Sequence, residues 1–125
     1  MPVAGAMMEA VTGTNLAVGS IWRLHHGNQE LARLTVTGSD MPWVYASIEA
    51  LDGFEAFRPV FAEQEQAIGA EDWTRADACY RRIRTELTMT FPDGRPVAEF
   101  MVHIHGDGTA GWRWHDEPFP TEVGR

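Results

Sequence analysis

Histidine and acidic residues gather in the C-terminal third of this sequence, where they could support metal binding. His103 and His105 are two residues apart, so on a β-strand both side chains lie on one face of the sheet, as two metal ligands would. A third ligand would have to come from a neighbour such as Asp107, His25 or His26. We expect a solvated sheet face that tolerates histidine, with no metal and no other cofactor. His103, His105 and Asp107 remain the alternative metal site.

Glu99 and His115 are the pair best suited to general-base chemistry, because a carboxylate can orient an imidazole. The predicted pairing of the last two strands places them directly opposite each other. An exposed pair of this kind is also common on sheets and contributes well under about 1 kcal/mol. With His103 they are the catalytic candidates. The sequence leaves open whether the protein is an enzyme and favours a non-enzymatic role.

Aromatic residues offer a second kind of site. Trp43 follows Pro42, and its side chain is predicted to point away from the core, so with Tyr45 it could line a ligand pocket or a partner surface. Met101 and Arg113 are predicted to face each other on the polar side of the last two strands. The expected binding residues are therefore Trp43, Tyr45, Met101 and Arg113.

Two motifs carry no chemistry here. Residues 106–111, GDGTAG, match the dinucleotide-binding fingerprint, but a strand containing Trp112 and Trp114 follows where the fingerprint needs a helix. We interpret these glycines as a hairpin turn. Cys79 falls on the apolar side of a predicted helix, which favours a small buried side chain over a nucleophile.

Net charge narrows the choice of partners. The 125 residues include 18 acidic and 10 basic residues, for a net charge of −8 at pH 7. This balance argues against binding to nucleic acid or to an anionic membrane, because phosphate neutralisation needs a basic patch. A basic protein or a small molecule is the expected partner. The oligomeric state cannot be inferred.

Several features predict a cytoplasmic protein. The single cysteine excludes an intramolecular disulfide, the N-terminus lacks a basic signal region, and no apolar run is long enough to span a membrane. All ten basic residues are arginine, which is typical of a GC-rich, and here we expect bacterial, genome.

The first half is predicted to form three strands. Alternation from Ser20 onward predicts a hairpin whose loop is Gly27-Asn28-Gln29, which keeps Trp22 and Leu24 on the same face as the apolar residues that follow. Those residues are Ala32, Leu34 and Val36. Residues 38–40 should end the second strand, and the third should run over 43–51.

Two helices are predicted next. Pro59 suits the first turn of a helix that ends at Gly69. The second helix begins with acidic residues 71–72 and ends with arginines at 81, 82 and 84, which favours the helix dipole. Its apolar stripe is Trp73, Ala76, Tyr80 and Ile83. The arginine cluster therefore has a structural explanation that we prefer to anion binding.

The last three strands form two predicted hairpins. The first turns at Asp93-Gly94 and should pair Met89 with Ala98 and Leu87 with Phe100. The second turns at residues 106–108, with Gly108 in the left-handed conformation, and should pair Val102 with Trp112 and Phe100 with Trp114. The opposite face would then carry Thr88, Glu99, Met101, His103, His105, Arg113 and His115.

The sequence thus predicts an α+β fold, in which a helical hairpin packs on one face of a mostly antiparallel sheet of five or six strands. Residues 1–18 are expected to be a flexible arm, 19–117 one domain and 118–125 an irregular tail. We expect a small acidic interaction or ligand-binding protein. The alternative is a small enzyme or metal-dependent protein that uses the polar face around Glu99, His103, His105, Arg113 and His115.

Overall fold

A computed structural model describes residues 16–40 and 42–115. Most of the predicted arm and all of the predicted tail lie outside the described residues. The elements in chain order are β1 (Ile21–His26), β2 (Gln29–Asp40), β3 (Trp43–Ala50), the 3₁₀ helix η1 (Asp52–Ala56), α2 (Arg58–Gly69), α3 (Trp73–Glu86), β4 (Thr88–Thr90), β5 (Glu99–Ile104) and β6 (Thr109–His115).

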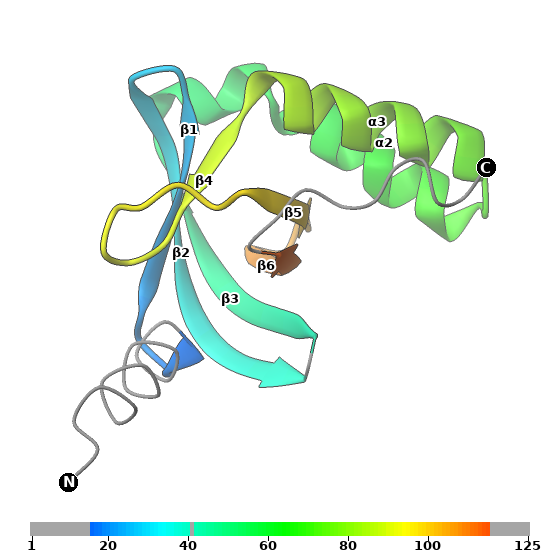
Figure 1. The fold of residues 1–125 in the computed structure, drawn as a ribbon. Coiled ribbons are helices and arrows are strands. Elements are labelled where there is room, and N and C mark those ends of the chain that lie inside the picture. Colours follow the sequence, from blue (N-terminus) through cyan, green and yellow to red (C-terminus); the bar gives the residue numbers. More distant parts are fainter. Residues whose placement is uncertain (1–15, 41, 116–125) are drawn as a thin grey trace, which may run out of the picture.

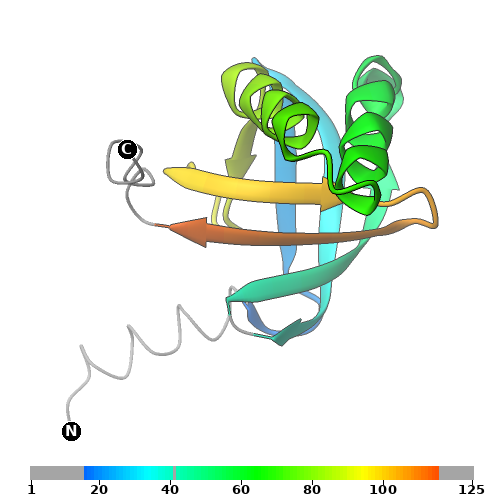
Figure 2. The ribbon, with the colours of Figure 1, turned by 90° about the vertical axis from the view of Figure 1, so that its right-hand side faces the viewer.

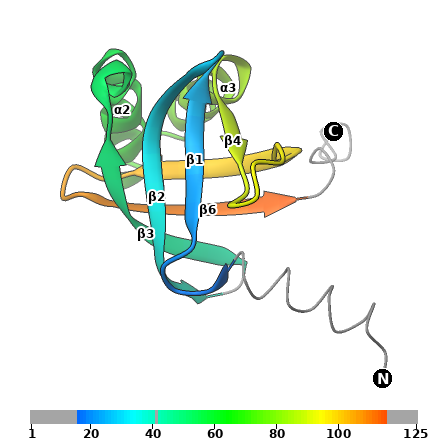
Figure 3. The ribbon, with the colours of Figure 1, turned by 90° about the vertical axis from the view of Figure 1, so that its left-hand side faces the viewer.

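The six strands form one antiparallel sheet in the order β4-β1-β2-β3-β6-β5. The sheet is strongly curved and barrel-like (Figures 1 and 3). Helices α2 and α3 lie side by side above β5, which is an edge strand of the sheet (Figure 2). The predicted α+β fold and order of elements are therefore confirmed.

One hydrophobic core fills the inside of the curved sheet. Trp22 is fully buried at its centre, with its ring 4.9 Å from that of Phe91 and 5.3 Å from that of Trp112. The helices close the core from above with Val60, Phe61, Cys79 and Ile83. Burial also raises the pKa of the Cys79 thiol, as the desolvation of a thiolate predicts. Leu16 packs against the core, so ordered contacts begin inside the segment predicted to be a flexible arm.

The hairpin of β5 and β6 has the predicted register. Phe100 pairs with Trp114 and Val102 pairs with Trp112. The turn is also as predicted, since Gly108 adopts a φ of +90°. Alternation then fixes two faces: Phe100, Val102 and Ile104 point into the core, and Met101 and His103 point out. We call the side that faces away from the core the outer face of the sheet.

The first hairpin has a two-residue turn, Gly27-Asn28, rather than the predicted three-residue loop, because His26 pairs with Gln29. A bulge after Leu24 then shifts the register by one residue. The shift restores the predicted core face, which the sequence pattern had identified correctly. The predicted core residues Ala32, Leu34 and Val36 are buried, and Leu31, at the bulge, is buried in the same core.

Residues 38–40 continue β2, although the sequence predicted a break there. They pair with β3, from Gly38 opposite Tyr45 to Asp40 opposite Trp43. The register shifts between Val36 and Gly38, which is typical of a bulge that bends a strand. Gly38 therefore marks a bend rather than an end.

β4 pairs with β1 rather than with β5. Met89 lies opposite Leu24, and an isolated bridge joins Thr90 to Pro96. Beyond this bridge the N–H of Val97 donates to the carbonyl of Met89, in a register that differs from the predicted one, and β5 then continues along β6. The predicted pairs, Met89 with Ala98 and Leu87 with Phe100, are therefore wrong.

Both predicted helices are present. The carboxylate of Asp72 caps α3 by accepting a hydrogen bond from the backbone N–H of Arg75. The arginines near the end of α3 form ion pairs within the domain: Arg81 with Asp77, Arg82 with Glu86, and Arg84 with Glu99. These pairs support the structural explanation of the cluster.

Candidate functional site

The far ends of α2 and α3 extend past β5 and overhang the outer face of the sheet (Figure 1). A groove with a volume of about 630 Å³ lies between them and this face. We call it the overhang groove. The sheet contributes Trp43, Met101 and His103, and the helices contribute Gln64, Ile68, Trp73, Ala76, Asp77 and Tyr80.

The sheet side of the groove is assembled across three strands. Trp43 comes from β3 and His103 from β5, and their rings lie 5.5 Å apart with 56° between their planes. Between these strands, Gly111 of β6 pairs with both Tyr45 and His103. The ring of Tyr45 lies against Gly111, and Trp43, two residues earlier on β3, reaches the imidazole diagonally across β6. Met101, half-buried, completes this wall.

His103 is half-buried in this wall, and its ring has no hydrogen-bonding partner within residues 16–40 and 42–115. Burial lowers the pKa of His103, and the neighbouring charge of His105 lowers it further, while Glu65 opposes the shift. The imidazole is therefore neutral near pH 7 and offers one N–H donor and one acceptor nitrogen.

The sequence predicted that Trp73, on the apolar stripe of its helix, would be a core residue. Its side chain is instead 62% exposed at the groove. Only the last member of the predicted stripe, Ile83, is buried. The first turns of α3 project beyond β5, so the same stripe that reaches the core at Ile83 faces the groove at Trp73 and Tyr80. Helical periodicity predicted the stripe correctly but could not show where the sheet beneath it ends.

Gln64 lies in the helical wall and is only 2% exposed. Its Oε1 has no hydrogen-bond partner among the described residues. Leaving a buried acceptor unsatisfied costs about 1–3 kcal/mol, so such a group in a native fold calls for an explanation. A ligand with a donor group would supply the missing hydrogen bond, after a rotation of the carboxamide toward the groove.

Two polar groups flank the aromatic rings of the groove. The carboxylate of Asp77 lies 2.9 Å from Nε of Arg81, in an exposed pair at the rim. The pKa of Tyr80 is raised, first by burial and then by the negative charge of Glu99, so its hydroxyl stays protonated. Neither arginine nor lysine lines the groove.

Of the catalytic candidates, Glu99 is already engaged. It is buried, and Nε of Arg84 donates a hydrogen bond to its Oε1, while the Arg84 guanidinium lies 4.3 Å from the centre of the Phe100 ring. His115 pairs with Glu99 in the predicted register, at the exposed end of β6. The carboxylate expected to orient His115 thus has a stronger, charge-assisted partner.

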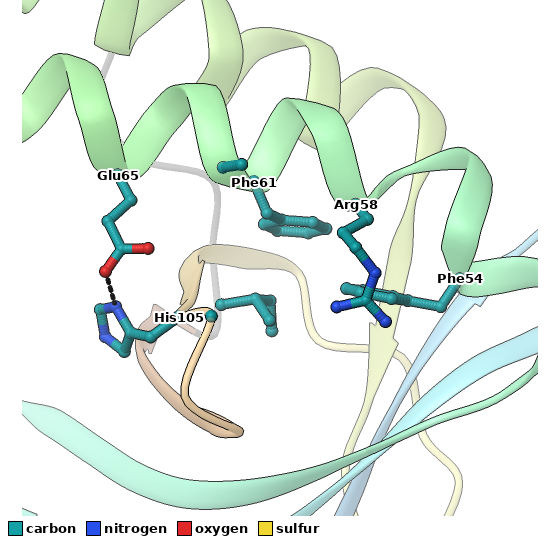
Figure 4. A pocket seen from close by; sticks show the side chains of 8 residues that line it. Phe54, Arg58, Phe61, Glu65 and His105 are labelled. Carbon is teal, nitrogen blue, oxygen red and sulfur yellow. Dashed lines mark hydrogen bonds and ion pairs between the residues drawn. The ribbon is translucent and has the colours of Figure 1, made fainter.

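The proposed metal ligands diverge. Nδ1 of His105 lies 3.1 Å from Oε2 of Glu65 on α2 (Figure 4). The imidazole of His103, by contrast, lies against the ring of Trp43. The carboxylate of Asp107 accepts hydrogen bonds from the backbone and hydroxyl of Thr109, which lower the pKa of Asp107. No group of three or more metal-ligating side chains occurs among the residues that the structure describes.

A second, smaller cavity lies beside His105. Its volume is about 60 Å³, and Figure 4 shows the rings of Phe54 and Phe61 and the side chain of Arg58 around it. The Arg58 guanidinium lies 5.0 Å from the centre of the Phe54 ring and is paired with Glu55. This cavity is far below the size of typical ligand pockets.

Of the predicted binding residues, Trp43 and Met101 line the overhang groove. Tyr45 is 43% exposed beside it, and Arg113 lies opposite Met101 on β6. The helical half of the groove was not predicted, because Gln64, Ile68 and Asp77 carry no motif. The one sequence signal near this wall is the tryptophan at the first position of α3, and only the structure shows that it is exposed.

Comparison of the chain with protein-family models, with curated proteins and with solved structures finds no match. Within the described ranges, no helix has the length and apolar character needed to cross a membrane.

Proposed function

We propose that this protein binds a small, largely apolar molecule in the overhang groove. The observation that carries this proposal is the exposure of Trp73 at a recess that also contains Trp43 and Tyr80. Large aromatic side chains left uncovered at a concave surface are typical of binding sites, because covering them removes apolar area from water. The groove volume, about 630 Å³, lies within the range of small-molecule sites.

The lining also supports binding of a small molecule. Most of the groove wall is apolar, and its few polar groups come from Gln64, Asp77, Tyr80 and His103. Ligand sites commonly combine an apolar surface with a few polar groups that fix orientation. A catalytic role has less support, because Glu99 is buried and its carboxylate already accepts a charge-assisted hydrogen bond from Arg84.

A neutral apolar dye, Nile red, tests the proposal with the full chain. Its fluorescence should rise on binding, and Trp73→Ser should weaken the affinity by about fivefold or more, because the indole forms the open wall of the groove. The matched control is Tyr45→Ser, which removes an exposed aromatic ring outside the groove lining and should change the affinity less than about twofold. Absence of dye binding, or equal losses in both variants, would contradict the proposal.

A further inference from the structure

The charges around the overhang groove restrict what it can bind, if it binds a small molecule as proposed. Asp77 is the only residue in the lining that carries a full charge near neutral pH, because the imidazole of His103 is neutral there. Eight described arginines form ion pairs with acidic side chains, and none of the eight lines the groove. The ninth described arginine, Arg113, lies opposite Met101 on β6 but is not part of the lining. A carboxylate or phosphate ligand would therefore meet a negative charge and no arginine in the lining of the groove.

Asp77 retains the capacity to bind a cation. Its side chain is 52% exposed, and its partner Arg81 is 77% exposed. Pairs this open to water are weak, and a carboxylate can accept further hydrogen bonds besides the one from Arg81. The carboxylate is thus available to a positively charged group at the rim.

The buried side chain of Gln64 in the helical wall also favours a ligand with an amine group. Oε1 of Gln64 lacks a donor, and an amine N–H could supply it. The rings of Trp43, Trp73 and Tyr80 line the same groove, and the faces of tryptophan and tyrosine attract organic cations. Carboxylate, amide oxygen and aromatic rings therefore favour one class of ligand.

We infer that the overhang groove binds an organic cation, namely a protonated amine attached to an apolar or aromatic body. The apolar body lies against Trp43, Met101 and Ile68, and the amine faces Asp77 and Gln64. This inference rests on the proposed function and deepens it by naming the ligand class.

Three probes of matched size test the inference: 4-phenylbutylammonium, the neutral 3-phenylpropanamide and the anion 3-phenylpropanoate. Their affinities are measured at pH 7.5 by titration followed in two-dimensional NMR spectra of the ¹⁵N-labelled chain. We expect the cation to bind about fivefold more tightly than the amide, and the anion to bind most weakly. Perturbed resonances should map to residues that line the groove.

Variants test whether the charge of Asp77 at the groove, rather than the net charge of the protein, causes the preference for a cation. Asp77→Asn should remove the preference for the cation over the amide, whereas Asp93→Asn, an equal charge change in the hairpin after β4, should leave it unchanged. Arg81→Ala removes the competing cation and should strengthen cation binding about twofold. Gln64→Leu should weaken the binding of the primary amine. It should not change the binding of the trimethylammonium analogue, which has no N–H to donate.

The outcomes distinguish the two proposals. Failure of all three probes to bind would contradict the proposed function itself. Equal affinities, or tightest binding of the anion, would leave the binding function in place and overturn the inference of a cation. An equal loss of cation binding in Asp77→Asn and Asp93→Asn would also overturn it, because net charge rather than the groove would then be responsible.

Discussion

The indole of Trp43 on β3 lies 5.5 Å from the imidazole of His103 on β5, although β6 separates the two strands in the sheet. This contact joins β3 to β5 on the outer face of the sheet and forms one wall of the overhang groove. It also helps to bury His103, which is the first cause of the lowered pKa of this residue. This contact therefore contributes both to the shape of the groove and to the burial that keeps His103 neutral.

The stability of the protein should fall on acidification through His103. Because its pKa is lower in the folded protein than the ordinary value of about 6.5, the unfolded chain binds more protons, and the free energy of unfolding decreases as the pH falls below about 6.5. Above that pH this contribution is complete. Urea unfolding at pH 7.5 and pH 5 should show a smaller decrease for His103→Gln than for the wild type. His25→Gln, at an imidazole that contacts Thr90 instead, is the control. The same decrease in His103→Gln and the wild type would refute this assignment.

The ion pair between Arg84 and Glu99 should be essential for stability. Arg84→Ala would leave the carboxylate of Glu99 buried and unpaired, at a cost of about 2–4 kcal/mol in the free energy of unfolding. Arg82→Ala on the same helix removes an exposed pair with Glu86 and should cost under about 0.5 kcal/mol. Chemical denaturation of both variants measures the difference. Similar losses would show that Glu99 remains solvated without its partner.

The two tryptophans of β6 should differ in their contribution to stability. Trp112 is fully buried, so Trp112→Ala should cost about 3–5 kcal/mol, whereas Trp114 is half-buried and Trp114→Ala should cost about half as much. The Trp114 ring still packs against Phe91, at 5.2 Å between centroids. Thermal unfolding of the two variants gives the order directly, and a larger loss at Trp114 would contradict the burial described here.

The β5–β6 turn allows a test of backbone strain with an internal control. Gly108→Ala places a side chain on a residue with φ of +90° and should destabilise the protein by about 1–2 kcal/mol. Gly106→Ala, two residues earlier, has open space around the added carbon and no positive φ, so it should have little effect. Denaturant midpoints that shift equally in the two variants would rule out the left-handed turn.

The sequence alone determined much of this fold, because alternation and turn chemistry are local. The pairs Val102–Trp112 and Phe100–Trp114 follow from period-two patterning and from the glycine at position 108. By contrast, the bulge after Leu24 could not be read from the chain. Its register depends on how the whole strand packs on the core rather than on the turn itself.

Only the tertiary structure decided where the site lies. Trp73 and Ile83 belong to one helical stripe, yet the first is exposed at a groove and the second is buried, because the sheet supports only part of α3. Trp43 and Met101 were predicted to bind a ligand from their outward direction alone, and the groove gains its other wall from Gln64, Ile68 and Asp77 on the helices. Local periodicity determines which side of an element is apolar. How far that element extends beyond its neighbours depends on contacts between distant segments, and this overhang creates the groove.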